Sequence, residues 1–483
     1  HHGMHRRFRY RRRIRNAPVG TANCSAVVSD SGRLFWHLCR VCTIKQAQSN
    51  VIAGLRRCPV VVYTASPSRR QVSAMIIRPF TLMIPFVCSL LGGHAQADTG
   101  EARTLEEVVA KYRADRVMEG VEAGEEQASP LFMTLGERRI AFAHFDALYP
   151  TVSLPASPTP SALPTELIDL GSIAFEANDA SHTLSSLMQS QHLMGLVVIQ
   201  DGKVRFEHYA PDHSKEAQWV TFSVTKSVTS LLIGAAIQDG YIDSADDPIV
   251  KYLPRLAGSE YDKSRIRDIL QMASGMEWNE DYEDPTSDVA IAGAFNGVAL
   301  TDYLYNKQRV AAPGTRFNYN TAESNLAGEI LRAAIGMNAG PYLSQKIWQP
   351  MGMAFDANWL LSSPFGRETG GCCISATVRD YARLGLFALA DGVLPDGTRV
   401  LPEGWMAAST TPSQGYDGYG YKWWLYGDGR YGARGVFGQA IFVDPVANLV
   451  VAAHSNGQVA SGSDHNRELD AALMAISAFF RAR

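Results

Sequence analysis

Ser223 and Lys226 are the residues whose types and spacing most directly indicate chemistry. A serine hydroxyl is a weak nucleophile and needs an adjacent base. A lysine three residues further along a helix lies on the same face, so its amine can reach that hydroxyl. Burial can depress a lysine pKa enough for it to act as the base, and a helix N-terminus directs amides toward a developing oxyanion. The pair predicts acyl transfer, although the motif alone also fits an ordinary solvated lysine.

Two later segments could complete this chemistry. The run Phe317-Asn318-Tyr319-Asn320-Thr321 offers the phenol of Tyr319, which could pass the serine's proton to a leaving group. By itself, Tyr319 would more simply be a loop aromatic with a satisfied hydroxyl. Further on, Gly435 precedes Val436, and the Val436 amide could form an oxyanion hole with the Ser223 amide. The alternative for that segment is a plain bulge before an edge strand.

The chain around these residues predicts a frame that could position them. Apolar residues at 196–199 and 204–206 flank Asp201-Gly202, which is a strong hairpin signal. Apolar residues at helical spacing predict a helix over 223–238, ended by Asp239-Gly240. Two apolar strands at 440–443 and 449–453 and an amphipathic helix at 467–481 close the chain. Because the late strands could pair with the first hairpin, we expect one α+β domain with a helical insertion.

In their order along the chain, these motifs resemble the serine β-lactamase and penicillin-binding-protein superfamily. The resemblance is greatest to the 6-aminohexanoate-dimer hydrolase branch and covers about residues 165–483. The segments that carry it, besides Ser223-x-x-Lys226, are Phe317-Asn318-Tyr319-Asn320-Thr321, Gly370-Gly371-Cys372, Thr377-x-Arg379-Asp380-x-x-Arg383-Leu384-Gly385, Tyr419-Gly420-Tyr421-x-Trp423-Trp424 and Gly438-Gln439-x-x-x-x-Asp444-Pro445.

This resemblance implies an antiparallel sheet flanked by helices, with an inserted, mostly helical subdomain and the active site between the two. It also implies acylation of Ser223 and hydrolysis of a small-molecule amide or ester, with no metal or organic cofactor. Four residues are candidates to line the substrate site, each of them also a plausible structural residue: Trp278, Tyr282, Trp424 and Gly435.

The substrate stays open between several classes. Ala433-Arg434-Gly435 stands where the family has Lys-Thr-Gly, so a short amide, an ester or a small lactone is as plausible as a β-lactam. A β-lactamase-like carboxylesterase is the alternative enzyme, and a non-catalytic penicillin-recognising cell-wall protein is the alternative outside catalysis. A Ser-His-Asp hydrolase is disfavoured, because the chain has no Gly-x-Ser-x-Gly elbow.

Charge and cysteine usage exclude other partners. A net charge of −3 gives no indication of a nucleic-acid partner. Cys39-x-x-Cys42 is half of a common zinc pattern without its second half, so we expect no metal site. The adjacent Cys372 and Cys373 are not expected to bond to each other. Nothing in the sequence indicates an oligomeric state.

The N-terminal quarter has the composition of processed sequence. Residues 75–97 combine Arg78, an apolar run over 79–91 and a small-residue Ala95-x-Ala97 site, which is the order of a secretory signal peptide. Residues 1–74 are then expected to be non-native upstream sequence, with 98–164 an N-terminal extension and linker and 165–483 the hydrolase domain. The leader predicts an exported protein, periplasmic or secreted, without a stable membrane anchor.

Overall fold

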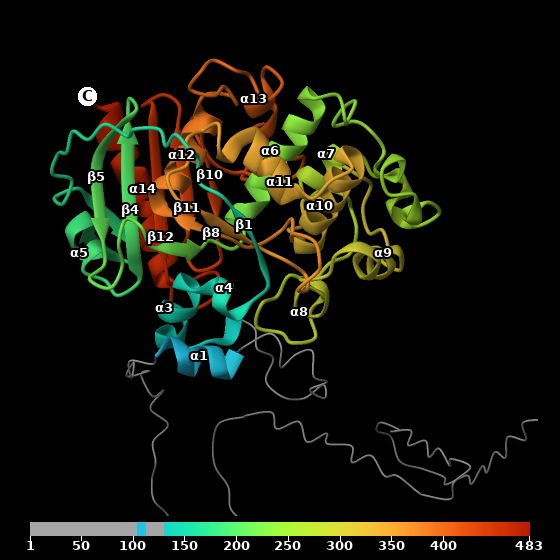
Figure 1. Cartoon of the computed structure of the whole chain (residues 1–483), viewed down its shortest axis with the longest axis horizontal. Helices are drawn as coiled ribbons and strands as arrows, with labels where there is room; N and C mark the ends of the chain where they lie inside the picture. Colours follow the sequence, from blue (N-terminus) through green and yellow to red (C-terminus); the bar gives the residue numbers. More distant parts are fainter. Residues whose placement is uncertain (1–103, 113–129) are drawn as a thin grey trace, which may run out of the picture. The chain divides into compact units, whose positions relative to one another are not determined.

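The computed structural model describes residues 104–112 and 130–483. The segment at 1–74 and the signal peptide expected at 75–97 lie outside these residues. Within them, an antiparallel sheet of six strands in the order β5-β4-β12-β11-β10-β9 forms the frame of the molecule (Figure 1). Its strands are β4 (Leu193–Gln200), β5 (Lys203–Tyr209), β9 (Trp424–Gly427), β10 (Arg430–Arg434), β11 (Ala440–Asp444) and β12 (Leu449–Ser455).

The predicted hairpin is confirmed, and it pairs with the end of the chain. Asp201 and Gly202 both have positive φ, 52° and 72°, which two-residue hairpin turns of this kind require. Strand β4 then pairs along its length with β12, from Gln200 opposite Leu449 to Leu193 opposite Ser455. The late strands therefore complete the sheet that the hairpin begins.

The two faces of this sheet follow the alternation of its side chains. Leu196 and Val198 pack against α14 (Asp464–Arg481) in one apolar cluster. Val197 and Ile199 belong to the larger core on the opposite face, which includes α12 (Val378–Leu389) and α6 (Val224–Gln238). The sheet is thus covered by helices on both sides, as predicted.

The inserted subdomain is helical and lies between β6 (Gln218–Val220) and β7 (Ala357–Leu360). It gathers at the side of the molecule away from β5 (Figure 1). Its helices after α6 are α7 (Ile266–Leu270), α8 (Asp288–Ala292), α9 (Gly297–Tyr305), α10 (Thr321–Ile335) and α11 (Ala339–Leu343), with short turns η2 (Ile249–Lys251), η3 (Pro254–Leu256), η4 (Glu260–Lys263) and η5 (Ser344–Trp348). The remaining helix of this half, α13 (Trp405–Ser409), follows α12.

A second sheet includes part of the segment that was expected to be an extension and linker. Its order is β1-β7-β8-β6, and β1 (Thr151–Leu154) pairs with β7 although it falls within 98–164. In this sheet β8 (Ile374–Thr377) lies between β7 and β6, and β6 is at the edge. The other described elements of the 98–164 segment are α1 (Leu105–Tyr112), η1 (Pro130–Phe132), α3 (Leu135–Ala143) and α4 (Phe145–Leu148). After it, β2 (Ala174–Ala177) and β3 (Ala180–Thr183) form a two-stranded sheet of their own, followed by α5 (Leu184–Met188). Residues 151–154 are therefore part of the fold and not of a linker.

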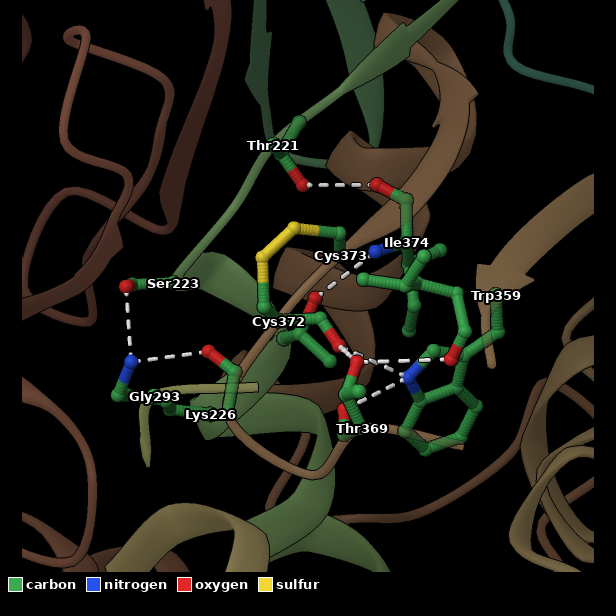
Figure 2. The surroundings of a disulfide bond; sticks show 12 residues. Thr221, Ser223, Lys226, Gly293, Trp359, Thr369, Cys372, Cys373 and Ile374 are labelled. Atoms are coloured by element: carbon green, nitrogen blue, oxygen red, sulfur yellow. Dashed lines mark hydrogen bonds between the residues drawn. A yellow bond between two sulfur atoms is a disulfide. The ribbon is translucent and has the colours of Figure 1, made fainter. Parts of the chain in front are cut away.

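Cys372 and Cys373 form a disulfide with each other, so the expectation that they do not bond is wrong (Figure 2). Their Cα atoms lie 3.3 Å apart across a cis peptide bond, an arrangement that the sequence pattern gave no reason to expect. The pair directly follows Gly371 and precedes β8. It therefore lies beside the segment that contacts Lys226.

Candidate active site

Ser223 and Lys226 meet at the start of α6, a helix that is buried almost throughout. Ser223 is the half-buried N-cap residue, whereas the Lys226 side chain is buried. The Lys226 Nζ donates to the Ser223 Oγ at 2.9 Å and to the carbonyl oxygen of Gly371 at 2.9 Å (Figure 2). The lysine is thus fixed between the hydroxyl and a backbone carbonyl.

Burial changes the proton affinity of this amine. Removal from water lowers the pKa of Lys226 to about 8, while the negative charge of Glu280 acts in the opposite direction. At pH 7 about a tenth of the side chain is therefore the free amine, and about half at pH 8, which is the form that can accept a proton from Ser223.

Tyr319 reaches the same place from the segment before α10. Its ring centre lies 5.2 Å from the Lys226 Nζ, and its ring stacks on Trp424 at 5.7 Å. Burial raises the pKa of Tyr319 well above its usual value and the charge of Glu280 adds to this, whereas a hydrogen bond with the Ser223 side chain lowers it. The phenol is therefore neutral at ordinary pH, and its ring lies beside the Lys226 amine.

Glu280 organises the loop beside these residues, and the sequence analysis missed it. Its carboxylate accepts hydrogen bonds from the Tyr282 hydroxyl at 2.7 Å and the Thr321 amide at 3.0 Å, and from the indole of Trp278 and the Thr321 hydroxyl. Trp278 and Tyr282, two of the expected substrate residues, are thus gathered around one acidic side chain. Its only sequence signal was its place between these two aromatics.

The Gly435–Val436 segment lies against the residues that precede Ser223. A Cβ added at Gly435 would stand 2.5 Å from the carbonyl oxygen of Thr221, so this approach requires glycine. Within the described residues, neither the Ser223 amide nor the Val436 amide donates to a protein acceptor. Both are therefore available to a ligand oxygen.

A second buried lysine, Lys422, was also missed. Its carbonyl oxygen accepts from the hydroxyl of Ser227 at 2.6 Å, and its Nζ lies 3.1 Å from the sulfur of Met272. Burial lowers the pKa of Lys422 to about 7, opposed by the charge of Glu323. Lys422 thus contacts the residue directly after Lys226, and the charge of Lys226 also lowers its pKa. A pattern along the sequence cannot reveal this contact.

A cavity of about 270 Å³ adjoins the loop that carries Tyr319. It is lined by Gly275, Met276, Glu277, Trp278, Val310, Arg316 and Asn318. In the part of the chain that the structure describes, no group of three or more His, Cys, Asp or Glu side chains could hold a metal ion. The same part contains no helix with the length and apolar content needed to cross a bilayer.

Comparison with known proteins shows what the chain is similar to. The model of the β-lactamase family matches residues 180–474, more than half of the chain. The 6-aminohexanoate-dimer hydrolase of Paenarthrobacter ureafaciens is 29% identical over 338 residues, covering 65% of this chain and 84% of the relative. A β-lactamase of Yersinia enterocolitica is 25% identical over 187 residues, covering 36% of this chain and 45% of the relative.

A solved structure of similar fold extends the likeness. A protein of Bacillus anthracis described as a 6-aminohexanoate-dimer hydrolase superposes with a TM-score of 0.62 at 20% identity, covering 70% of this chain and 93% of that one. At that identity the likeness shows the fold alone, and the fold predicted from the sequence is confirmed. The chain belongs to the β-lactamase family and is a serine hydrolase of the superfamily that also includes the penicillin-binding proteins.

Proposed function

We propose that the protein hydrolyses a small linear amide or ester through an acyl-enzyme on Ser223. The observation that carries this proposal is the buried Lys226 amine, 2.9 Å from the Ser223 hydroxyl and with a pKa of about 8. The 29% identity to a 6-aminohexanoate-dimer hydrolase supports a linear amide of that kind as the first substrate to test.

In the first half-reaction, the Ser223 oxygen attacks the carbonyl carbon while Lys226 takes the hydroxyl proton. The amides of Ser223 and Val436 stabilise the oxyanion. Tyr319, neutral and beside both groups, passes the proton to the leaving nitrogen or oxygen as its bond to carbon breaks. In the second half-reaction, water attacks the acyl carbon, its proton returns along the same route, and the Ser223 hydroxyl is restored.

The aromatic side chains around this centre would bind the substrate. Trp424 stacks on Tyr319, and Trp278 lines the 270 Å³ cavity, so both are placed to contact an acyl or amine chain. Tyr282, which donates to Glu280, and Gly435, which packs against the Thr221 carbonyl, are the other two candidates. The leader-like residues 75–97 support export to the periplasm or medium, where such substrates would be met.

The test compares the mature chain from Asp98 with its Ser223→Ala variant. The 6-aminohexanoate dimer, p-nitrophenyl esters and a cephalosporin would be supplied separately, and a fluorophosphonate probe would be used with mass spectrometry to detect the adduct. We expect turnover and a Ser223 adduct in the wild type, with neither in the variant. Full activity in Ser223→Ala would refute the assignment.

A further inference from the structure

Helix α3, which precedes the stretch matched by the family model, places one aromatic ring behind the candidate oxyanion hole. Phe142 is completely buried and contacts two other phenylalanines. Its ring centre lies 5.0 Å from that of Phe222 and 5.3 Å from that of Phe437, and these two rings are themselves 5.3 Å apart. Phe222 directly precedes Ser223, and Phe437 directly follows Val436.

The backbone of Phe222 needs such support. Its φ is +47°, in the left-handed region that a bulky residue rarely adopts. Such a conformation persists only where the surroundings over-determine it. Because the Ser223 amide belongs to the peptide unit that follows Phe222, the direction of that N–H depends on the Phe222 backbone.

Helix α3 also contacts the segment that carries the Val436 amide. Arg138 lies over the Phe437 ring at 4.6 Å and donates to the Asn456 side chain at 2.9 Å and to the Gly457 carbonyl at 2.8 Å. The loop that contains Asn456 and Gly457 in turn donates two hydrogen bonds to the backbone at Val436 and Phe437. The Gly457 amide donates to the Phe437 carbonyl at 2.8 Å, and the Ser461 amide donates to the Val436 carbonyl at 2.7 Å.

We propose that α3 is a positioning element of the oxyanion hole, with Phe142 as the residue that fixes the two amides relative to each other. The inference rests on the proposed function, because it assigns a task to amides that act only if Ser223 is acylated. Phe142 touches no substrate. It acts through Phe222 and Phe437, one ring for each of the two N–H groups.

The experiment compares Phe142→Ala with Phe145→Ala in the mature chain. Phe145 is a matched control, because it is equally buried in the neighbouring helix α4 but its ring packs on Tyr149 instead of the two phenylalanines beside the amides. Three quantities are measured for each: the melting temperature, kcat and KM on the best substrate, and the affinity for a boronic acid. The boronate adduct on Ser223 is tetrahedral and presents an oxygen to both amides, so its affinity reports the oxyanion hole.

We expect both variants to lose a similar amount of thermal stability. Only Phe142→Ala should lower kcat, by about 10- to 100-fold, with KM nearly unchanged and boronate affinity reduced by a similar factor. Phe142→Leu, which keeps apolar volume without the ring, should show the same pattern at smaller size and decides the matter if the alanine variant does not fold.

Either of two results would overturn the inference about α3 and leave the proposed function standing. One is a Phe142 variant that keeps wild-type kcat and boronate affinity, and the other is equal kcat losses in the two alanine variants. A wild-type protein without a fluorophosphonate adduct on Ser223 would instead overturn the proposed function, and the inference with it.

Discussion

Two buried cations, Lys226 on α6 and Arg332 on α10, donate to carbonyls of the same backbone segment. Lys226 reaches the Gly371 carbonyl at 2.9 Å, and Arg332 reaches the Glu368 carbonyl at 2.8 Å. Their other partners differ. Arg332 forms ion pairs with Glu329 at 2.5 Å and with Glu368 at 3.7 Å, whereas the second partner of Lys226 is the uncharged hydroxyl of Ser223.

The different partners of these two buried basic side chains give them different roles. The carboxylates in contact with the Arg332 guanidinium compensate for the hydration that this charge loses on burial. A buried lysine without such a contact has its pKa lowered instead, and it can then exchange a proton near neutral pH. The first arrangement holds the segment at 368–371 in place, and the second prepares the amine for chemistry.

Replacing Lys226 should have the largest effect. Lys226→Met removes the proposed base but keeps the length of the side chain. The kcat/KM should therefore fall by at least about 10⁴-fold, nearly as much as in Ser223→Ala, as expected for two members of one catalytic unit. The melting temperature should stay the same or rise, since no ion pair is broken. Lys346→Met, which alters a partly exposed lysine paired with Asp239, is the control and should keep full activity.

Replacing Arg332 should lower stability and leave activity nearly unchanged, which is the reverse of the pattern expected for Lys226. Arg332→Met leaves Glu368 buried without its cation and leaves Glu329 with only its Arg367 partner, so the free energy of unfolding should fall by about 3–5 kcal/mol. Urea denaturation measures this change. The kcat of the folded fraction should stay within about twofold of wild type, and a large loss of kcat at unchanged stability would contradict the comparison.

The pH dependence of kcat/KM gives a separate test of the Lys226 amine. The proposed mechanism uses the free amine of Lys226 as the base, so kcat/KM should fall about tenfold per unit as pH drops below the pKa of about 8. Because the charge of Glu280 raises that pKa, Glu280→Gln should move the acid limb to lower pH. A pH–rate profile measures both, and a limb that stays in place in the variant would argue against Glu280 as a source of the local field.

The smallest effect concerns a buried pair that is neutral and has no chemistry to perform. His213 and His454 share a hydrogen bond of 3.0 Å, and burial lowers the pKa of His213 to about 4 and that of His454 well below its usual value. The unfolded chain binds these protons near pH 6.5 and the folded chain does not, so stability should be full above that pH. It should decline as pH falls from 6.5 toward 4. Acid titration of the melting temperature tests this, and His213→Gln should flatten the decline.

Features that depend on residues close together in the chain could be predicted from the sequence. The Ser223–Lys226 geometry follows from spacing on one helix, and the Asp201-Gly202 turn follows from its residue types. The segments containing Tyr319 and Val436 were found as motifs, but their meeting with Ser223 depends on the packing of α10 and β10 around α6. Glu280, Phe142 and Lys422 could not be found in this way, because each is tied to the site by a contact between distant positions. The contacts of Glu280 with Thr321, of Phe142 with Phe437 and of Lys422 with Ser227 span 41, 295 and 195 positions of the chain.

The pairing of β4 with β12 has a consequence for how the protein is made. Strand β4 has its outer neighbour β5 directly after it, but its inner neighbour is synthesised about 250 residues later. A nascent chain therefore carries an apolar strand edge that nothing in the already translated part can satisfy. Closure of the sheet must wait until β12 has been synthesised, so we expect truncations that remove β12 to aggregate.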